Sequence, residues 1–568
     1  MPNDTLPGST DTPGDTAANT PRDTTTGAAT LASARRRLAA RLVRGTLWSM
    51  LGIAALGFTR LVYTALLGRT GDPARLAEIN AQVSLAFFAT FATAAATGAG
   101  AAKFLPLATA RWGPAAAVSV RRKLSLWTLA GSGLVVGLLG VAGRWVLPGA
   151  GWLDVATACA LTAAYSAYTF AKSVLYGHDL ARRYAVLEVG ADLAILALTV
   201  AAVAWAPPPW RALLVLPLVI GYAGFALAAA ASTPRWPGEL SEGRPSREQL
   251  RQQRQSDQPR EPGRQPRQAR PQREPMPPLG TELGGFVAFT ALGIAAGQGF
   301  FQVSMVVAGH TTAGAQAGVY AAAMALVGPA FFLPRALALA FFPAAAEAVG
   351  RGDAAALARH TATVTRVLAV SMLPAFTLAA MLGGPALGLV FGPSYAGGGA
   401  VFAILVLAVL LYVIAVPSVN VLSAYDLSLA RIPPLASTVG VVLGTLTWLV
   451  VTPHLGAVGI AVGYLAAMVV QAGTPVVVAF RRLGLVRVRT IARYAATGAA
   501  GIALAGVAVA VPRIDVTTGC VVAFGAVFAV LQGREVAGTV RAVHRLAVTP
   551  TVTSNNEDSV PTQTTDTA

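Results

Sequence analysis

The sequence predicts an all-α protein that crosses a membrane many times. Of its 568 residues, 55% are hydrophobic and only 12% are charged, whereas about a quarter of the residues of a soluble domain are charged. The charges also crowd into short segments between long apolar runs. Many of these runs reach the ~20 residues with which an α-helix crosses a ~30 Å hydrocarbon core.

Fourteen apolar stretches are long enough to be membrane-spanning helices. The last two are the most weakly marked, so twelve spans are the alternative. The stretches centre on residues 43–68, 80–105, 123–148, 152–176, 183–206, 210–232, 283–309, 315–343, 362–391, 398–423, 432–451, 456–480, 490–511 and 516–533.

The distribution of basic residues predicts the orientation. Clusters of Arg and Lys recur in alternate loops, and cytoplasmic loops of membrane proteins carry such an excess. With both termini in the cytoplasm, fourteen spans place nearly all clusters inside. The outer loops are short, so they leave little room for a catalytic domain, and we expect a transporter rather than an enzyme. These outer loops hold only scattered basic residues: Arg69, Arg75, Arg144, Arg211 and Arg513.

One polar segment divides the apolar chain. Residues 233–280 are rich in Arg, Gln and Pro. The part from Arg235 to Glu274 contains ten Arg and six acidic residues, so its net charge is about +4. Such a composition cannot form a core, so we predict a disordered cytoplasmic linker; a sensor for anionic lipid headgroups is the alternative. It separates an N-lobe (35–232, six spans) from a C-lobe (281–482, six spans). Two extra helices follow (483–547), and residues 1–34 and 548–568 are predicted disordered tails.

Composition also excludes several classes of function. The net charge of +18 does not gather into one basic patch, which argues against nucleic-acid binding. Cys159 and Cys520 both lie in apolar runs and the five histidines are scattered, so we expect neither a metal site nor a cofactor. Arg supplies 40 of the 43 basic residues, which together with abundant Ala and Gly is typical of a GC-rich bacterial genome. We therefore expect the protein to lie in a bacterial plasma membrane. We also expect it to be a monomer.

Three stretches of the second half resemble a known family. They are "AGVYAAAMALVGPAFFLPRALALAFFPAAAEA" from Ala317, "LGLVFGPSYAGGGAVFAILVLAVLL" from Leu387 and "VTPHLGAVGIAVGYLAA" from Val451. Their order and spacing resemble the polysaccharide-flippase (Wzx-type) branch of the MOP superfamily, whose relatives are MurJ-type lipid II flippases and MATE exporters. Many members carry an acidic residue about fourteen positions before the Gly-x-Tyr of Gly318, where this chain has Ser304.

The resemblance implies two six-helix lobes around a central cavity. It also implies a function, which is to move a polyprenyl-pyrophosphate-linked oligosaccharide from the inner to the outer leaflet by alternating access. The implied partners are this lipid-linked glycan, membrane lipids, and the glycosyltransferases and polymerase of glycan assembly. A MurJ-like lipid II flippase and a small-molecule antiporter remain alternatives. A membrane-embedded glycan polymerase or ligase is disfavoured, because such enzymes need a substantial outer loop with polar catalytic groups.

Arg60 is the first candidate site residue, because it interrupts an apolar run. It lies sixteen residues after Arg44 and eight before Gly68, so about 24 Å and 12 Å from the two ends of a helix. A charge at this depth should face protein or water. In a flippase its planar donor fork would hold a pyrophosphate; a structural ion pair is the alternative.

Two carboxylates supply a possible partner for Arg60. Glu188 and Asp192 are four residues apart and therefore share one helix face. We hypothesise an Arg60–Asp192 pair within the membrane. An anionic substrate or a proton would break this pair and so couple transport to the proton gradient.

The remaining candidates are polar residues within or near spans. Lys103 and Arg335 lie near the predicted cytoplasmic ends of the second and eighth helices, where the resemblance implies that they attract the substrate to the inward-facing mouth. Anchoring at the membrane surface is the alternative for both. Gln298, Gln302 and Asn420 could contact sugars, or could form hydrogen bonds between helices.

Overall fold

The computed structural model describes residues 47–70, 72–147, 149–205, 213–233, 280–331, 341, 345, 348–349, 352–424, 427–485 and 488–548. Apart from short connections, these residues are helical, and the described part contains no strand. The predicted tails (1–34 and 548–568) and the linker (233–280) fall outside the described residues except at their boundaries. The candidate Arg335 also falls outside them.

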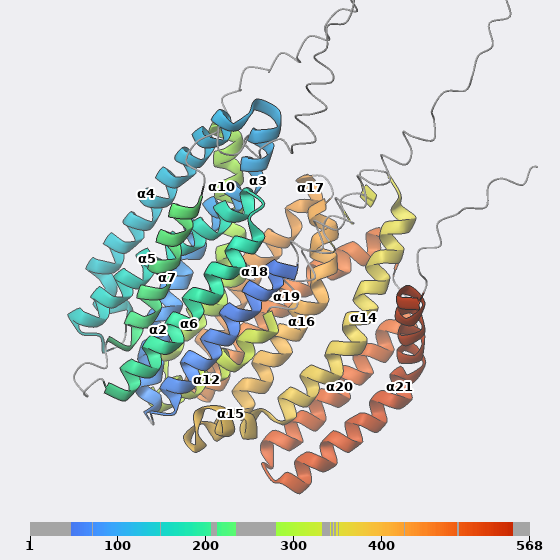
Figure 1. Ribbon diagram of the computed structural model, residues 1–568. Coiled ribbons are helices and arrows are strands. Elements are labelled where there is room, and N and C mark those ends of the chain that lie inside the picture. Colours follow the sequence, from blue (N-terminus) through green and yellow to red (C-terminus); the bar gives the residue numbers. More distant parts are fainter. Residues whose placement is uncertain are drawn as a thin grey trace, which may run out of the picture.

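The helices before residue 234 form one group, which we call the N-terminal bundle. They occupy one side of the molecule in Figure 1, in blue to green. The centre of the group is α5, which packs against α2, α3, α4 and α7. The helices are the first helix (Leu47–Gly68), α2 (Pro73–Ala92), α3 (Ala94–Trp112), α4 (Pro114–Val146), α5 (Trp152–Gly177), α6 (Ala181–Trp205) and α7 (Leu216–Ser232).

The helices after residue 279 form a second group, the C-terminal bundle. Its α18 and α19 pack along each other more extensively than any other described pair of helices. Its members are α10 (Gly280–Ile294), the π-helix η2 (Ala295–Gly299), α11 (Phe300–Thr311), α12 (Gly314–Val327), the 3₁₀ turn η3 (Gly328–Phe331), α14 (Ala354–Met381), α15 (Gly383–Phe391), η4 (Pro393–Gly398), α16 (Gly399–Ala424), α17 (Leu427–Ala430), α18 (Ile432–Leu455), α19 (Ala457–Arg482), α20 (Val488–Ala510) and α21 (Ile514–Val548).

The all-α polytopic fold is confirmed, with a helix at each of the fourteen predicted places. Twelve described helices are long and apolar enough to cross a membrane, or thirteen if the bent pair α2–α3 counts as one span. The remaining helix, α5, has 26 residues, about 39 Å at 1.5 Å per residue. Its many Thr, Ser and Tyr side chains lower its hydropathy, so it is not among the twelve.

Two of the spans that contact the other bundle are irregular. The second span bends by 43° between α2 and α3, at Thr93, whose backbone leaves the helical region. The seventh span contains the π-helical turn η2 within the glycine-rich sequence "GIAAGQG". A π-turn inside a helix shifts the register of the side chains and is frequent at functional sites.

Small residues allow close packing inside the C-terminal bundle. Gly444 of α18 faces Gly463 of α19, and a Cβ at Gly444 would lie 2.8 Å from the Gly463 carbonyl oxygen. A Cβ at Gly463 would lie 2.1 Å from the Trp448 ring, whose Nε1–H donates to the Ile460 carbonyl at 2.8 Å. Small residues that let helix backbones approach are the usual means of helix association in membranes.

The two extra helices α20 and α21 pack on the outer side of α14, as Figure 1 shows in red beside yellow. Polar contacts join them: Glu535 pairs with Arg366 of α14 at 3.4 Å and with Arg493 of α20 at 3.9 Å. The Gln532 amide also donates to the Thr497 hydroxyl at 3.0 Å, and both side chains are buried. These contacts attach the pair to the C-terminal bundle away from the centre of the molecule.

The two bundles meet tightly at the end that the charge pattern predicts to be outside. A Cβ at Gly318 of α12 would lie 2.0 Å from the Pro73 carbonyl oxygen at the start of α2. Arg69 donates to the Leu389 and Val390 carbonyls at 2.5 and 3.0 Å, which are among the last carbonyls of α15. These contacts close the outer end of the interface between the bundles.

A third contact lies at the same end. His310, near the end of α11, donates through Nε2 to the Val146 carbonyl at the end of α4, at 2.6 Å. Backbone approach and side-chain hydrogen bonds thus act together, and all three contacts have to break before the outer ends can separate.

Candidate functional site: a cavity between the bundles

A cavity lies at the interface of the two bundles, beneath the closed outer end. Its volume is about 130 Å³, room for roughly ten water molecules. The first helix, α2 and α5 line one side, while η2, α11, α12, η3, α16 and α19 line the other. The lining residues are Leu56, Gly57, Arg60, Thr64, Asn80, Ser84, Phe91, Tyr165, Gly297, Gln298, Phe301, Gln302, Met324, Ala325, Gly328, Phe331, Tyr412, Tyr464 and Met468.

Arg60 is the only charged residue among the described residues of this lining. Its guanidinium lies over the Phe87 ring, 4.0 Å from the centroid, and Phe87 stacks in turn on Tyr165 at 3.9 Å between centroids. A cation over an aromatic face is held by the ring quadrupole while its edge donors stay free to meet a ligand. The side chain is therefore positioned without a carboxylate partner in the cavity wall.

The C-terminal side of the cavity carries amides and aromatic rings. Gln298 comes from the π-turn η2 and Gln302 from the first turn of α11, so two of the three predicted amides face the same cavity. Gln302 is only 6% exposed, and its side-chain oxygen has no hydrogen-bond partner among the described residues. An amide in this position can accept a hydrogen bond from a ligand.

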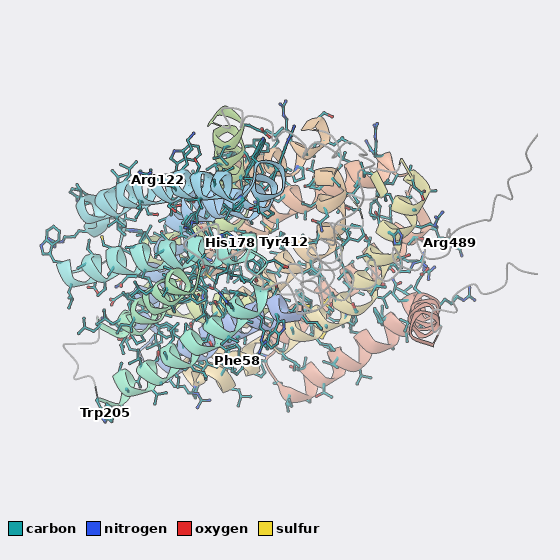
Figure 2. All side chains as sticks on the ribbon, turned by 45° about the horizontal axis from the view of Figure 1, so that its top comes forward. Phe58, Arg122, His178, Trp205, Tyr412 and Arg489 are labelled. Atoms are coloured by element: carbon teal, nitrogen blue, oxygen red, sulfur yellow. The ribbon has the colours of Figure 1, made fainter. Side chains whose placement is uncertain are left out.

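Four aromatic residues form a continuous wall beside these amides. Ring centroids lie 5.0 Å apart for Tyr464 and Phe301, 5.2 Å for Phe301 and Phe331, and 5.8 Å for Phe331 and Tyr412. All four line the cavity, and we call them the aromatic wall. Figure 2 places Tyr412 near the middle of the molecule, between the bundles.

Glu188 and Asp192 are buried inside the N-terminal bundle and are not among the residues that line the cavity. They share the buried face of α6, at 1% and 4% exposure. The Tyr168 hydroxyl donates to Glu188 Oε1 at 2.6 Å, and the Lys172 ammonium lies 3.3 Å from the same hydroxyl. Asp192 accepts a hydrogen bond from Thr59, the residue before Arg60.

The hypothesised Arg60–Asp192 ion pair is not formed among the described residues. Arg60 instead stacks on Phe87, and Asp192 bonds to Thr59 on the adjacent position of the first helix. Residues one apart on a helix point about 100° apart around its axis, so Arg60 does not point along the direction from which Thr59 meets Asp192, although Tyr222 lies within electrostatic range of both charges. One oxygen of each carboxylate, Glu188 Oε2 and Asp192 Oδ2, is buried without a hydrogen-bond partner in the described part of the chain.

The other sequence candidates lie elsewhere. Lys103 is not among the residues that line the cavity; its ammonium lies over the rings of Phe104 and Phe286, at 5.1 and 4.3 Å. It therefore bridges α3 and α10 at the predicted cytoplasmic end. Asn420 of α16 does not line the cavity either, and its amide nitrogen is buried without a described partner.

Ser304 stands where the family resemblance leads one to expect an acid. Its hydroxyl accepts a hydrogen bond from the Tyr320 hydroxyl at 2.7 Å and donates to the Phe301 carbonyl at 2.6 Å, and the group is fully buried. This position is thus a helix-to-helix contact between α11 and α12. In the described part of the chain, no group of three or more His, Cys, Asp or Glu is placed to hold a metal ion.

The sequence interpretation missed the aromatic wall and the polar residues of α2. Asn80 and Ser84 are four apart and both face the cavity, so a polar stripe on one face of the second span was a usable signal. The wall carries no such signal, because Phe and Tyr are also common in lipid-facing and core positions.

No protein-family model matches the chain, and no curated protein sequence matches it. Several solved structures do match. Lipid II flippase MurJ in an inward closed conformation aligns with a TM-score of 0.56 and 11% identity over 86% of this chain and 98% of that one. The chain has the fold of the MOP-superfamily transporters.

Two further structures agree on this fold. An inward-facing multidrug resistance MATE family transporter aligns with a TM-score of 0.55 and 12% identity, covering 77% of this chain and 95% of that one. A MOP superfamily transporter from Pyrococcus furiosus, described as having a binding pocket of reverse polarity, aligns with a TM-score of 0.52 and 14% identity over 78% and 95%. None of these three is described as a polysaccharide flippase.

Proposed function

We propose that this protein is a flippase that moves polyprenyl-pyrophosphate-linked oligosaccharide across a bacterial plasma membrane by alternating access of its two bundles. The observation that carries the proposal is the position of Arg60. It is the one charge in the described lining of a cavity between the bundles, inside a fold shared with a lipid II flippase. Intramembrane charges of this kind mark substrate pathways.

The chemistry of the cavity suits such a substrate. A pyrophosphate offers oxygen acceptors to the planar guanidinium of Arg60, and charge-assisted hydrogen bonds of this type are about twice as strong as neutral ones. Thr64, Asn80 and Ser84 line the same N-terminal side and add neutral donors. The outer end of the interface is closed in this structure, so the bundles have to move apart there before an oligosaccharide can pass to that side.

Lipid II is the second candidate substrate, favoured by the MurJ structure among the neighbours. It is also a polyprenyl pyrophosphate bearing sugars, so it would use the same cation. The motifs quoted from the second half favour the polysaccharide branch over this candidate.

The test is translocation by the purified full-length chain in lipid vesicles. A polyprenyl-pyrophosphate-linked oligosaccharide with a labelled sugar is placed in one leaflet, and its arrival in the other is followed with an enzyme that modifies only exposed sugar. We expect translocation without formation of new glycosidic bonds. Transport of lipid II in preference to this probe would support the second candidate. Elongation of the glycan would indicate a polymerase, and movement of neither lipid would overturn the proposal.

The buried carboxylates provide the coupling element of this proposal. Glu188 and Asp192 lie one helical turn apart, and the charged or titratable groups that face them are Lys172, Tyr168 and Tyr184, together with Tyr222 of α7, which also lies within electrostatic range of Arg60. Ionisable residues inside a membrane are costly and mark proton relays. Uptake of a proton by this pair changes the charge beside the first helix, which carries Arg60.

We therefore expect Asp192→Asn to remove the response of translocation to a proton gradient and to lower the rate several-fold. Translocation in vesicles with and without an imposed pH difference measures this. Asp515→Asn is the matched control, because Asp515 is exposed and pairs with Arg513 at the predicted outer surface. An Asp192→Asn protein with the rate and the pH response of the wild type would refute the coupling role.

A further inference from the structure

We infer that the cavity recognises its substrate in two parts, with the phosphate held by the N-terminal bundle and the first sugar held by the C-terminal bundle. This inference rests on the proposed function, and it assigns Gln302 and the aromatic wall as the residues that determine sugar specificity. The two sides of the described lining differ in chemistry. The N-terminal side has the only charge of this described lining, Arg60, with small hydroxyl and amide groups and the separate rings of Phe91 and Tyr165, and the C-terminal side has neutral amides among four connected rings.

The C-terminal side fits a sugar rather than an anion or a lipid tail. A pyranose presents C–H groups on its faces and hydroxyls around its rim. Aromatic rings offer a negative face to the C–H groups, and amides offer both a donor and an acceptor to the hydroxyls. A lipid tail would need no amide, and it would leave the partnerless oxygen of Gln302 unsatisfied.

The π-turn η2 and the start of α11 place the two amides, Gln298 and Gln302, in the cavity lining. The π-turn η2 comes directly before α11, and Gly297 and Gln298 within it line the cavity together with Gln302. Residues four apart share one face of a helix, so Gln298 and Gln302 face the cavity together, and the π-turn changes the register of α11 relative to α10. The terminal torsion of Gln is broad and nearly two-fold, so the Gln302 amide can present either end to a sugar hydroxyl.

The arrangement makes the substrate a bridge between the bundles. Arg60 and the Gln302–aromatic wall side belong to different bundles, so a glycolipid that contacts both joins the two moving parts. A bare polyprenyl pyrophosphate contacts only the first. Sugar recognition is thus tied to closure of the cavity around the complete substrate.

The experiment compares two probes on the purified full-length protein. They are polyprenyl pyrophosphate alone and the same lipid bearing one N-acetylhexosamine, and their dissociation constants are measured by ligand-induced fluorescence change. The wild type is expected to bind the glycosylated probe more tightly. Gln302→Leu and Phe331→Leu should each raise the dissociation constant of the glycosylated probe about two- to tenfold, because each variant loses one hydrogen bond or one ring contact to the sugar. Both should leave the bare probe unchanged.

Matched variants control for loss of packing. Gln471→Leu removes a buried amide of α19 that does not line the cavity, and Phe376→Leu removes a ring of α14 away from it. Neither control variant should change the ratio of the dissociation constants of the two probes.

Three outcomes overturn the inference. One is equal weakening of both probes by Gln302→Leu and Phe331→Leu. Another is equal binding of both probes by the wild type, in which case the proposed function stands without a sugar subsite. The third is failure of the wild type to bind either probe, which overturns the proposed function as well.

Discussion

Replacing Arg60 with alanine is expected to abolish glycolipid translocation while leaving the protein folded. The guanidinium is the only charge in the described cavity lining, so its loss leaves the pyrophosphate in an apolar membrane interior with neutral partners alone. Hydrogen bonds to charged groups contribute about 1.5–3 kcal/mol, which corresponds to about a 10- to 150-fold loss of affinity. Binding of polyprenyl pyrophosphate and vesicle translocation measure the two consequences. Arg60→Lys should restore part of the binding, because it keeps the charge but loses the planar fork.

Arg144→Ala is the matched control for this experiment. Arg144 also rests on an aromatic ring, with its guanidinium 5.2 Å from the Trp152 centroid, but it lies at the predicted outer end of α4, away from the cavity. It should bind and translocate as the wild type does. If Arg60→Ala keeps wild-type affinity for polyprenyl pyrophosphate, Arg60 is a structural residue and the proposed function loses its main support.

Gly318→Ala is expected to open the outer end of the interface and stop transport. A Cβ at this position would lie 2.0 Å from the carbonyl oxygen and 2.7 Å from the Cα of Pro73, and a backbone cannot move aside as a flexible side chain can. Overpacking of this kind costs about 1–3 kcal/mol, so the ratio of closed to open protein falls at least about fivefold. The hydrogen bonds of Arg69 and His310 across the same interface remain in this variant, and they offset the lost stability of the closed state only in part.

The opening can be measured by labelling from outside. Ser84→Cys, in a background with Cys159→Ala and Cys520→Ala, places a thiol in the cavity lining. A membrane-impermeant thiol reagent should label it slowly in the parent and several-fold faster with Gly318→Ala. Gly473→Ala is the control, since nothing lies within 4 Å of its added Cβ. Equal labelling rates in parent and variant would show that this contact does not control outer access.

The positions of the helices were predictable because one physical rule sets them. Each backbone group in a membrane must be satisfied within its own helix, so a run of apolar residues near the length of the bilayer is already a helix. This is why the regular spans, such as 456–480 against Ala457–Arg482, agree within a few residues. The bend at Thr93 and the π-turn at 295–299 were not predictable, because hydropathy sets the length of a span and not the irregularities within it.

The candidate site was predictable only in part. The depth of Arg60 followed from counting residues along a helix, and its place in a cavity with Gln298 and Gln302 agrees with the family resemblance. Its partner did not follow, because distance along the membrane normal says nothing about direction around the helix axis. In the structure Arg60 lies over the Phe87 ring, and Asp192 accepts a hydrogen bond from Thr59.

The sequence by itself determined the class of protein, the places of the helices and the residues too polar to face lipid. Hydropathy is a property of a local stretch of residues, so it can be calculated from the sequence without knowing the tertiary contacts. Only the tertiary structure decided which polar groups share a cavity, which rings form the aromatic wall and which end of the interface is closed. Those features depend on rotation of helices about their axes and on contacts such as Gly318 with Pro73, between residues that are distant in the chain.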